Sequence, residues 1–166
     1  MLYHLNRLVL PLIVSNILHM IAIKKGWLPG LARPVSVRLF GANKTWRGFI
    51  LLPLLNGLAL PLFSHDAPFP ESFALGAVLG LVYMIFELPN SYLKRHIGIA
   101  PGGEASRNRY LFMLMDKTDS SLGVSLAYYL ITGIGILEAC VLFVIGSAAH
   151  ILFSLLLVSL RIKRSF

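Results

Sequence analysis

The most constraining feature of the sequence is a nearly unbroken apolar block of about forty residues, 121–160. An α-helix crosses the hydrocarbon core of a bilayer in roughly 17–25 residues, so the block is too long for one span. We divide it at Glu138, which Gly133 and Gly135 closely precede, because glycines beside a charged residue favour a break between helices. The block therefore predicts two membrane-spanning helices joined by a short connection.

Three earlier stretches have the same length and apolar character. Apolar residues make up 57% of the 166 residues and charged residues only 13%, which is about half the usual charged share. A soluble domain of this size leaves about 30% of its surface in water and cannot hide so much apolar side chain. The composition therefore excludes a soluble monomer and a disordered chain, and the single cysteine excludes a disulfide scaffold. We expect one transmembrane domain, an all-α integral membrane protein over residues 1–166. Its five expected spans cover residues 5–23, 46–63, 73–88, 121–137 and 139–160.

The basic residues lie on one side of these five spans. Fourteen of the 15 Lys and Arg residues fall in or beside the two long loops, about 24–45 and 90–120, or in the tail after residue 160. Because positively charged loops stay in the cytoplasm during insertion, this predicts an outside N-terminus and a cytoplasmic C-terminus in the plasma membrane. The net charge of +8 then follows from topology, and we expect no nucleic-acid partner.

Three of the acids at the predicted cytoplasmic face are candidate ligands. Glu87 is in the last turn of an apolar span, where a carboxylate is costly; it is either a snorkelling or capping group, or a metal or proton-handling ligand. Asp116 and Asp119 share one face if their segment is helical, although Asp119 also suits an N-cap. Oxygen ligands near basic residues favour Mg²⁺ bridging phosphates. His19 and His150 lie singly in spans, and we interpret them as packing residues.

The first long loop ends in a short basic motif. Lys44 and Arg47 begin the second predicted span, and Gly41 and Gly48 allow close approach of the backbone. Helix-terminal amides with two cations are typical of a polyphosphate cradle. The same pattern is also the ordinary positively charged end of a membrane span.

The motifs combine into a larger ordered set that extends over most of the chain. Its residues are Pro11, Asn16, Gly41, Asn43, Lys44, Thr45, Trp46, Arg47, Gly48, Glu87, Pro89, Asn90, Ser91, Tyr92, Leu93, Lys94, Arg95, Gly98, Pro101, Gly102, Asp116, Asp119 and Ser120. In this order the set resembles the CDP-diacylglycerol synthase superfamily, and most of all its small branch, the CDP-archaeol synthases. The length, five spans and outside N-terminus also agree with that branch.

The resemblance implies transfer of CMP from CTP to a membrane lipid phosphate, which gives a CDP-lipid and pyrophosphate. It implies that Mg²⁺ binds Asp116, Asp119 and Glu87. The catalytic residues that it implies are Lys94, Arg95, Asp116 and Asp119. The substrate-binding residues that it implies are Asn16, Asn43, Lys44, Thr45, Arg47, Asn90 and Ser91.

Two departures from the family pattern leave the lipid open between an archaeol-phosphate-like and a phosphatidic-acid-like molecule. Asn43 and the preceding alanine replace an acidic position found in many relatives. Gly102-Gly103-Glu104 and an Arg107-x-Arg pair replace the Lys-Asp and His-Gly-Gly residues of the larger relatives.

Two other functions remain open. A CTP-dependent membrane lipid kinase would transfer the γ-phosphate instead of CMP. A transporter or a non-catalytic membrane scaffold is the second alternative. Apart from Arg47 at the edge of the second span, however, the spans between Leu8 and Ile85 carry no charged residue, which is unlike a transport pathway. Gly76 and Gly80 form a small-xxx-small motif, which is typical of close helix contacts either within one chain or between two chains of a homodimer.

Overall fold

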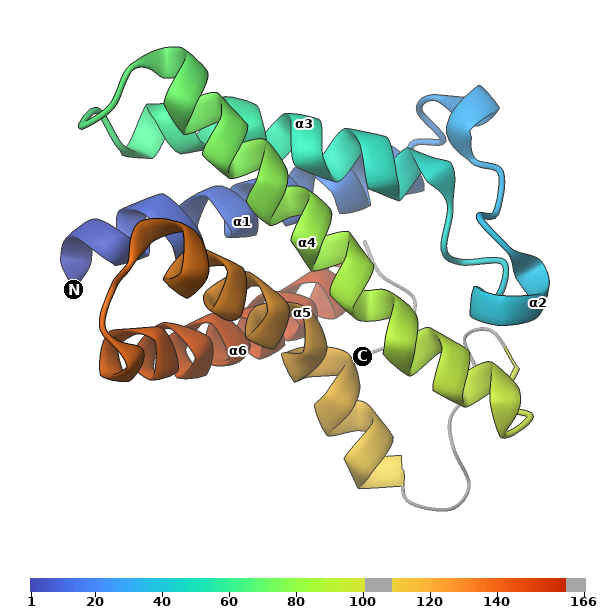
Figure 1. Cartoon of the computed structure of the whole chain (residues 1–166). Coiled ribbons are helices and arrows are strands. Elements are labelled where there is room, and N and C mark those ends of the chain that lie inside the picture. The colour runs from blue at the N-terminus through green and yellow to red at the C-terminus, as the bar shows by residue number, and fades with distance from the viewer. Residues whose placement is uncertain (101–108, 161–166) are drawn as a thin grey trace.

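The computed structural model describes residues 1–100 and 109–160, which form a bundle of helices (Figure 1). Within these residues the only pairing of extended segments is an isolated bridge between Pro34 and Thr45. The prediction of an all-α chain is therefore confirmed. The described elements are α1 (Leu2–Lys24), the 3₁₀-helix η1 (Pro29–Leu31), α2 (Val37–Phe40), α3 (Trp46–Phe63), α4 (Phe69–His96), α5 (Arg109–Thr132) and α6 (Ile136–Ser159).

Four of the described helices, α1, α3, α4 and α6, are long and apolar enough to cross a membrane. Large apolar side chains cover their outer surfaces; Leu62 of α3 and Leu137 of α6 are largely exposed. Such surfaces are costly in water and are typical of helices that face lipid. The structure therefore supports the prediction of a membrane protein.

The fourth expected span, 121–137, is not one continuous helix, which corrects the prediction. The chain leaves α5 after Thr132 through Gly133, which has a φ of +67°. Glu138 belongs to the first turn of α6, where its carboxylate accepts a hydrogen bond of 2.8 Å from the N–H of Gly135. The acid caps the second helix instead of separating the two, so the break lies a few residues earlier than expected.

The second long loop, expected over about 90–120, is also shorter than predicted. α4 continues through Pro89 to His96, and α5 begins at Arg109. Basic residues in the last turn of α4 interact favourably with the negative end of the helix dipole, so a polar sequence stays helical there. Of the sequence-predicted features, Pro101-Gly102, Gly103-Glu104 and Arg107 lie outside the described residues.

The small-residue motif of α4 faces α3 of the same chain. A Cβ on Gly76 would lie 2.5 Å from the backbone oxygen of Asn56, and one on Gly80 would lie 2.8 Å from the Cα of Pro53. Asn56 also donates a hydrogen bond of 2.7 Å to the carbonyl of Gly76. The motif therefore lets two helices of one chain approach closely, which is the first of the two expected roles.

The long helices alternate in direction along the bundle (Figure 1). The end of α1, the start of α3, the end of α4 and the start of α5 lie toward the same end of the bundle, which we call the polar end (residues 24–47, 87–100 and 109–120). Between the two ends lies an apolar core to which Leu52, Leu79, Tyr83, Tyr128 and Leu142 contribute. This alternation brings residues from separate parts of the sequence to one end of the molecule.

Candidate functional site

Asn90 connects the two predicted metal ligands. Its Nδ2 donates hydrogen bonds of 2.6 Å to Asp116 Oδ1 and 3.3 Å to Asp119 Oδ2. The aspartates are three residues apart on α5, so the helix directs both carboxylates to the same side, toward α4. Asn90 is only 4% exposed. The structure therefore brings Asp116, Asp119 and Asn90 together.

A lysine neutralises one of these carboxylates. Lys94, one turn after Asn90 on α4, forms an ion pair with Asp116. Asp119 instead accepts a hydrogen bond of 2.6 Å from the backbone N–H of Ser120. Hydrogen-bond donors thus balance part of the charge of both carboxylates, and among the described residues only Asn90 bonds to the two of them.

Glu87 lies one turn before Asn90 and has a different partner. It forms an ion pair with Lys44, from the connection that precedes α3. The Ser91 hydroxyl donates a hydrogen bond of 2.9 Å to the backbone carbonyl of Glu87, within the same helix. Among the described residues, no three His, Cys, Asp or Glu side chains are grouped closely enough to hold a metal ion.

The side chains of Asn90, Asp116 and Asp119 can nevertheless supply oxygen ligands of the kind that a hard cation prefers. The Oδ1 atom of Asn90 is buried and has no hydrogen-bond partner in the described part of the chain, while its Nδ2 faces both carboxylates. Rotation of the amide by half a turn would replace Nδ2 by Oδ1. Asp116, Asp119 and Asn90 would then offer three oxygen ligands, the type that Mg²⁺ prefers, with water completing the shell.

Two arginines extend the positive charge of the polar end. Arg95 follows Lys94, and its Nε and Nη1 atoms are buried without a hydrogen-bond partner among the described residues. Arg47, in the first turn of α3, donates from Nη1 to the carbonyl of Trp27 at 3.0 Å. With Lys44 and Lys94 they are four of the cations at the polar end of the bundle, which can balance the charge of a polyphosphate.

Three other predicted residues are used differently. Asn16 donates a hydrogen bond of 2.9 Å to the Tyr83 hydroxyl inside the bundle. Thr45 is the N-cap residue of α3 and makes no side-chain cap hydrogen bond, and Asn43 is exposed in the preceding turn. None of the three contacts the aspartates or Lys94 through a hydrogen bond found in the structure.

The interior also holds polar residues that the sequence did not single out as functional. The Tyr83 hydroxyl lies 3.3 Å from His150 Nε2. Lys117, on α5 between the two aspartates, is buried and donates a hydrogen bond of 2.8 Å to Ser154 of α6. Its position in the sequence between the two aspartates was a usable signal for Lys117, but nothing in its spacing indicated α6 as the partner.

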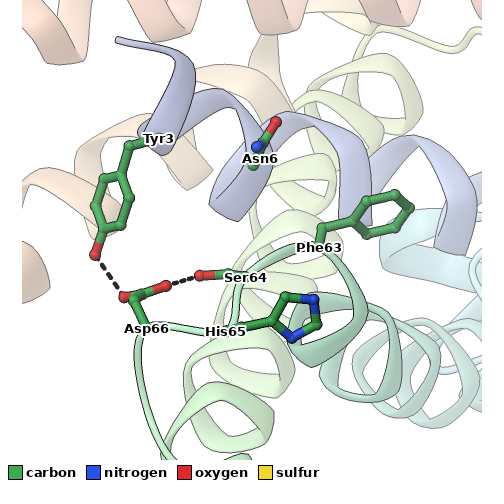
Figure 2. Close-up of a pocket in the computed structure, with 6 residues that line it drawn as sticks. All are labelled: Tyr3, Asn6, Phe63, Ser64, His65 and Asp66. Atoms are coloured by element: carbon green, nitrogen blue, oxygen red, sulfur yellow. Dashed lines mark hydrogen bonds between the residues drawn. The ribbon is translucent and has the colours of Figure 1, made fainter.

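A shallow hollow lies at the opposite end of the bundle (Figure 2). In it Asp66 accepts a hydrogen bond of 2.6 Å from the Tyr3 hydroxyl and another from Ser64, and pairs with Arg7 at 3.1 Å. These contacts attach the start of α1 to the connection between α3 and α4, so we interpret them as structural. The hollow is lined by Tyr3, Asn6, Phe63, Ser64, His65 and Asp66.

Comparisons of the chain with protein-family models, curated proteins and solved structures find no match. The arrangement of Asn90, Asp116 and Asp119 among fixed cations, at one end of a bundle with an apolar surface, is therefore the main guide to function.

Proposed function

We propose that the protein is a CTP-dependent lipid-phosphate cytidylyltransferase that acts at the inner face of the plasma membrane. The observation that carries the proposal is the convergence of Asp116 and Asp119 on Asn90. Lys94, Arg95 and other cations lie at the same end of the bundle. The sequence resemblance to CDP-archaeol synthases supports the same reaction.

The proposed reaction requires no nucleophile from the protein. An oxygen of the lipid phosphate attacks the α-phosphorus of CTP in line and forms the new P–O bond. The bond from the α-phosphorus to the oxygen bridging to the β-phosphate breaks, and pyrophosphate leaves with that electron pair. The protein therefore has to align two anionic reactants and balance their charge.

Each part of the cluster has a role in this scheme. Asp116, Asp119 and Asn90 would hold Mg²⁺, which when bound screens the phosphates and stabilises the leaving group. Lys94 and Arg95 add fixed positive charge beside this position, which stabilises charge that develops on the departing phosphates. Because the cluster lies at one end of an apolar bundle, a lipid headgroup reaches it from the bilayer and a nucleotide reaches it from water.

Product analysis tests the proposal directly. The purified protein is incubated with Mg²⁺, a panel of lipid phosphates, and CTP labelled at either the α- or the γ-phosphorus. We expect label from the α-phosphorus in a CDP-lipid and release of pyrophosphate. Asp119→Asn abolishes this product, whereas Asp66→Asn, at the other end of the bundle, does not.

The same experiment separates the alternatives. Transfer of the γ-label to a lipid acceptor, with release of CDP, identifies a lipid kinase and overturns the proposal. The absence of any labelled lipid from a protein that remains folded indicates a scaffold and overturns it as well.

A further inference from the structure

Arg47 is a buried cation without a carboxylate partner. Only 8% of the residue is exposed. Its Nη1 donates to the Trp27 carbonyl, but its Nε is buried and has no hydrogen-bond partner in the described part of the chain. None of the three ion pairs between described residues includes it. A buried guanidinium without a counter-ion is costly, so this position favours an anion.

A second orphaned group lies close by on α1. His19 is 8% exposed, and its Nε2 atom is buried without a hydrogen-bond partner among the described residues. A Cβ on Gly48 would lie 3.4 Å from this atom, so the imidazole lies against the first turn of α3. Its nearby charges are Glu87, Arg47 and Lys44. Because Glu87 pairs with Lys44, its charge is already balanced.

The start of α3 adds a third source of positive potential. Its first turn contains no acidic residue, and the Thr45 side chain makes no cap hydrogen bond. The backbone N–H groups of Trp46 and Gly48 bond to the carbonyls of Arg33 and Thr45. The helix end therefore contributes mainly its dipole, whereas the unused donors belong to the arginine and the histidine.

We propose that Arg47, His19 and the first turn of α3 form the subsite that binds the phosphate group of the lipid substrate. This assignment rests on the proposed function and divides the cluster into two parts. Lys94, Arg95 and the aspartates remain on the side of the nucleotide. The interpretation of His19 as a packing residue is thereby replaced by a binding role.

The surroundings of this subsite favour a lipid over free CTP. His19 lies five residues before the end of α1, within a helix of membrane-spanning length. Trp46 is 50% exposed, and Leu18 and Ile50 are also exposed. Apolar side chains at this position offer lipid chains a surface next to the phosphate, and an interfacial tryptophan is typical of headgroup depth.

Binding measurements without nucleotide test the subsite. The probe is a short-chain phosphatidic acid, titrated into the purified protein in detergent and followed by calorimetry and phosphorus NMR. Each charged hydrogen bond contributes enough that Arg47→Gln and His19→Gln should each weaken binding about tenfold to a hundredfold. The matched controls, Arg7→Gln and His4→Gln, change the same residue types at the opposite end of α1 and should leave the affinity unchanged.

The outcomes are distinguishable. The subsite is overturned if both test variants bind the lipid as tightly as the wild type. It is also overturned if the variants bind CTP more weakly while their affinity for the lipid is unchanged. A second titration uses inorganic phosphate. If it binds as tightly as the lipid and the same variants weaken both, the site is a general phosphate site and the lipid assignment is wrong. If Arg47→Gln does not fold, His19→Gln alone decides. Lipid binding that depends on His19, without any CDP-lipid product, supports the subsite and refutes only the proposed reaction.

Discussion

Lys44, in the connection before α3, forms an ion pair with Glu87, near the end of α4 and 43 positions away in the sequence. Both side chains are largely buried. The pair attaches the first long connection to the helix that carries Asn90 and Lys94. Glu87 thus pairs with Lys44 and Asp116 with Lys94, whereas Asp119 accepts hydrogen bonds from Asn90 and from the backbone of Ser120.

Glu87→Gln should destabilise the protein, because it leaves the Lys44 ammonium without its counter-charge. Removal of one partner of a buried ion pair costs about 3 kcal/mol. The thermal midpoint of the detergent-solubilised protein measures the loss. The double variant Glu87→Gln with Lys44→Met should recover much of it. A double variant no more stable than the single one would show that the pair is not the cause.

Lys94→Met should strengthen metal binding in the absence of nucleotide. The Lys94 ammonium competes with a cation for Asp116, so its removal should increase the affinity for Mn²⁺ about tenfold or more, the worth of a charge-assisted contact. Electron paramagnetic resonance of Mn²⁺ measures this directly. Turnover should fall by about 10²–10³ in the same variant, since a charge that stabilises the leaving phosphates is lost.

Asp119→Asn should have the opposite effect to Lys94→Met and weaken Mn²⁺ binding. Lys24→Met, at an exposed residue in the last turn of α1 that forms no ion pair with either aspartate, is the control for a general change in surface charge. Equal Mn²⁺ affinity in the wild type, Lys94→Met and Asp119→Asn would argue against a cation between α4 and α5.

Gly123→Ala should destabilise the contact between α4 and α5. A Cβ at this position would lie 2.1 Å from the Phe86 ring, so the ring or a helix must move, at a cost of about 1–3 kcal/mol. The second substitution Phe86→Leu should relieve the clash. Gly146→Ala is the matched control, because its Cβ would lie 3.6 Å from the nearest atom, on Ser121. The measurement is the thermal midpoint of the wild type, Gly123→Ala, the double variant and Gly146→Ala. Equal midpoints in all four proteins would contradict close packing between Gly123 and Phe86.

The Asp66 contacts should make the opposite end of the bundle sensitive to acid. Hydrogen bonds from Ser64 and then Tyr3 lower the pKa of Asp66 below its ordinary value of 3.8. A carboxyl whose pKa is lower in the folded state stabilises the fold above its unfolded pKa, and this contribution disappears as the pH falls through the folded value. Asp66→Asn should therefore lower the thermal midpoint at neutral pH. The difference from the wild type should vanish well below pH 3.8. A constant difference at every pH would exclude this origin.

Hydropathy predicted the positions of the long helices but not all their ends. The second span, 46–63, matches α3, because its apolar stretch and the helix begin and end together. α4 and α5 extend beyond their apolar parts to His96 and back to Arg109. Backbone hydrogen bonds form equally well in a polar sequence, so a hydropathy pattern cannot locate such ends.

The candidate site was predictable where it depends on local spacing. Asp116 and Asp119 are one turn apart, which was sufficient to place them on one face of a helix. The position of Asn90 between them depends on how α4 packs on α5, and the pairing of Lys44 with Glu87 depends on the path of a long connection. Such tertiary contacts leave no periodic signal in a single sequence.

The alternation of the long helices has a practical consequence for labelling. The start of α1 and the end of α6 lie at opposite ends of the bundle (Figure 1). If the helices stand across a bilayer, a fluorescent or enzymatic reporter fused before the first helix and one fused after the last must report different compartments. Two such fusions of one chain would therefore act as controls for each other in living cells.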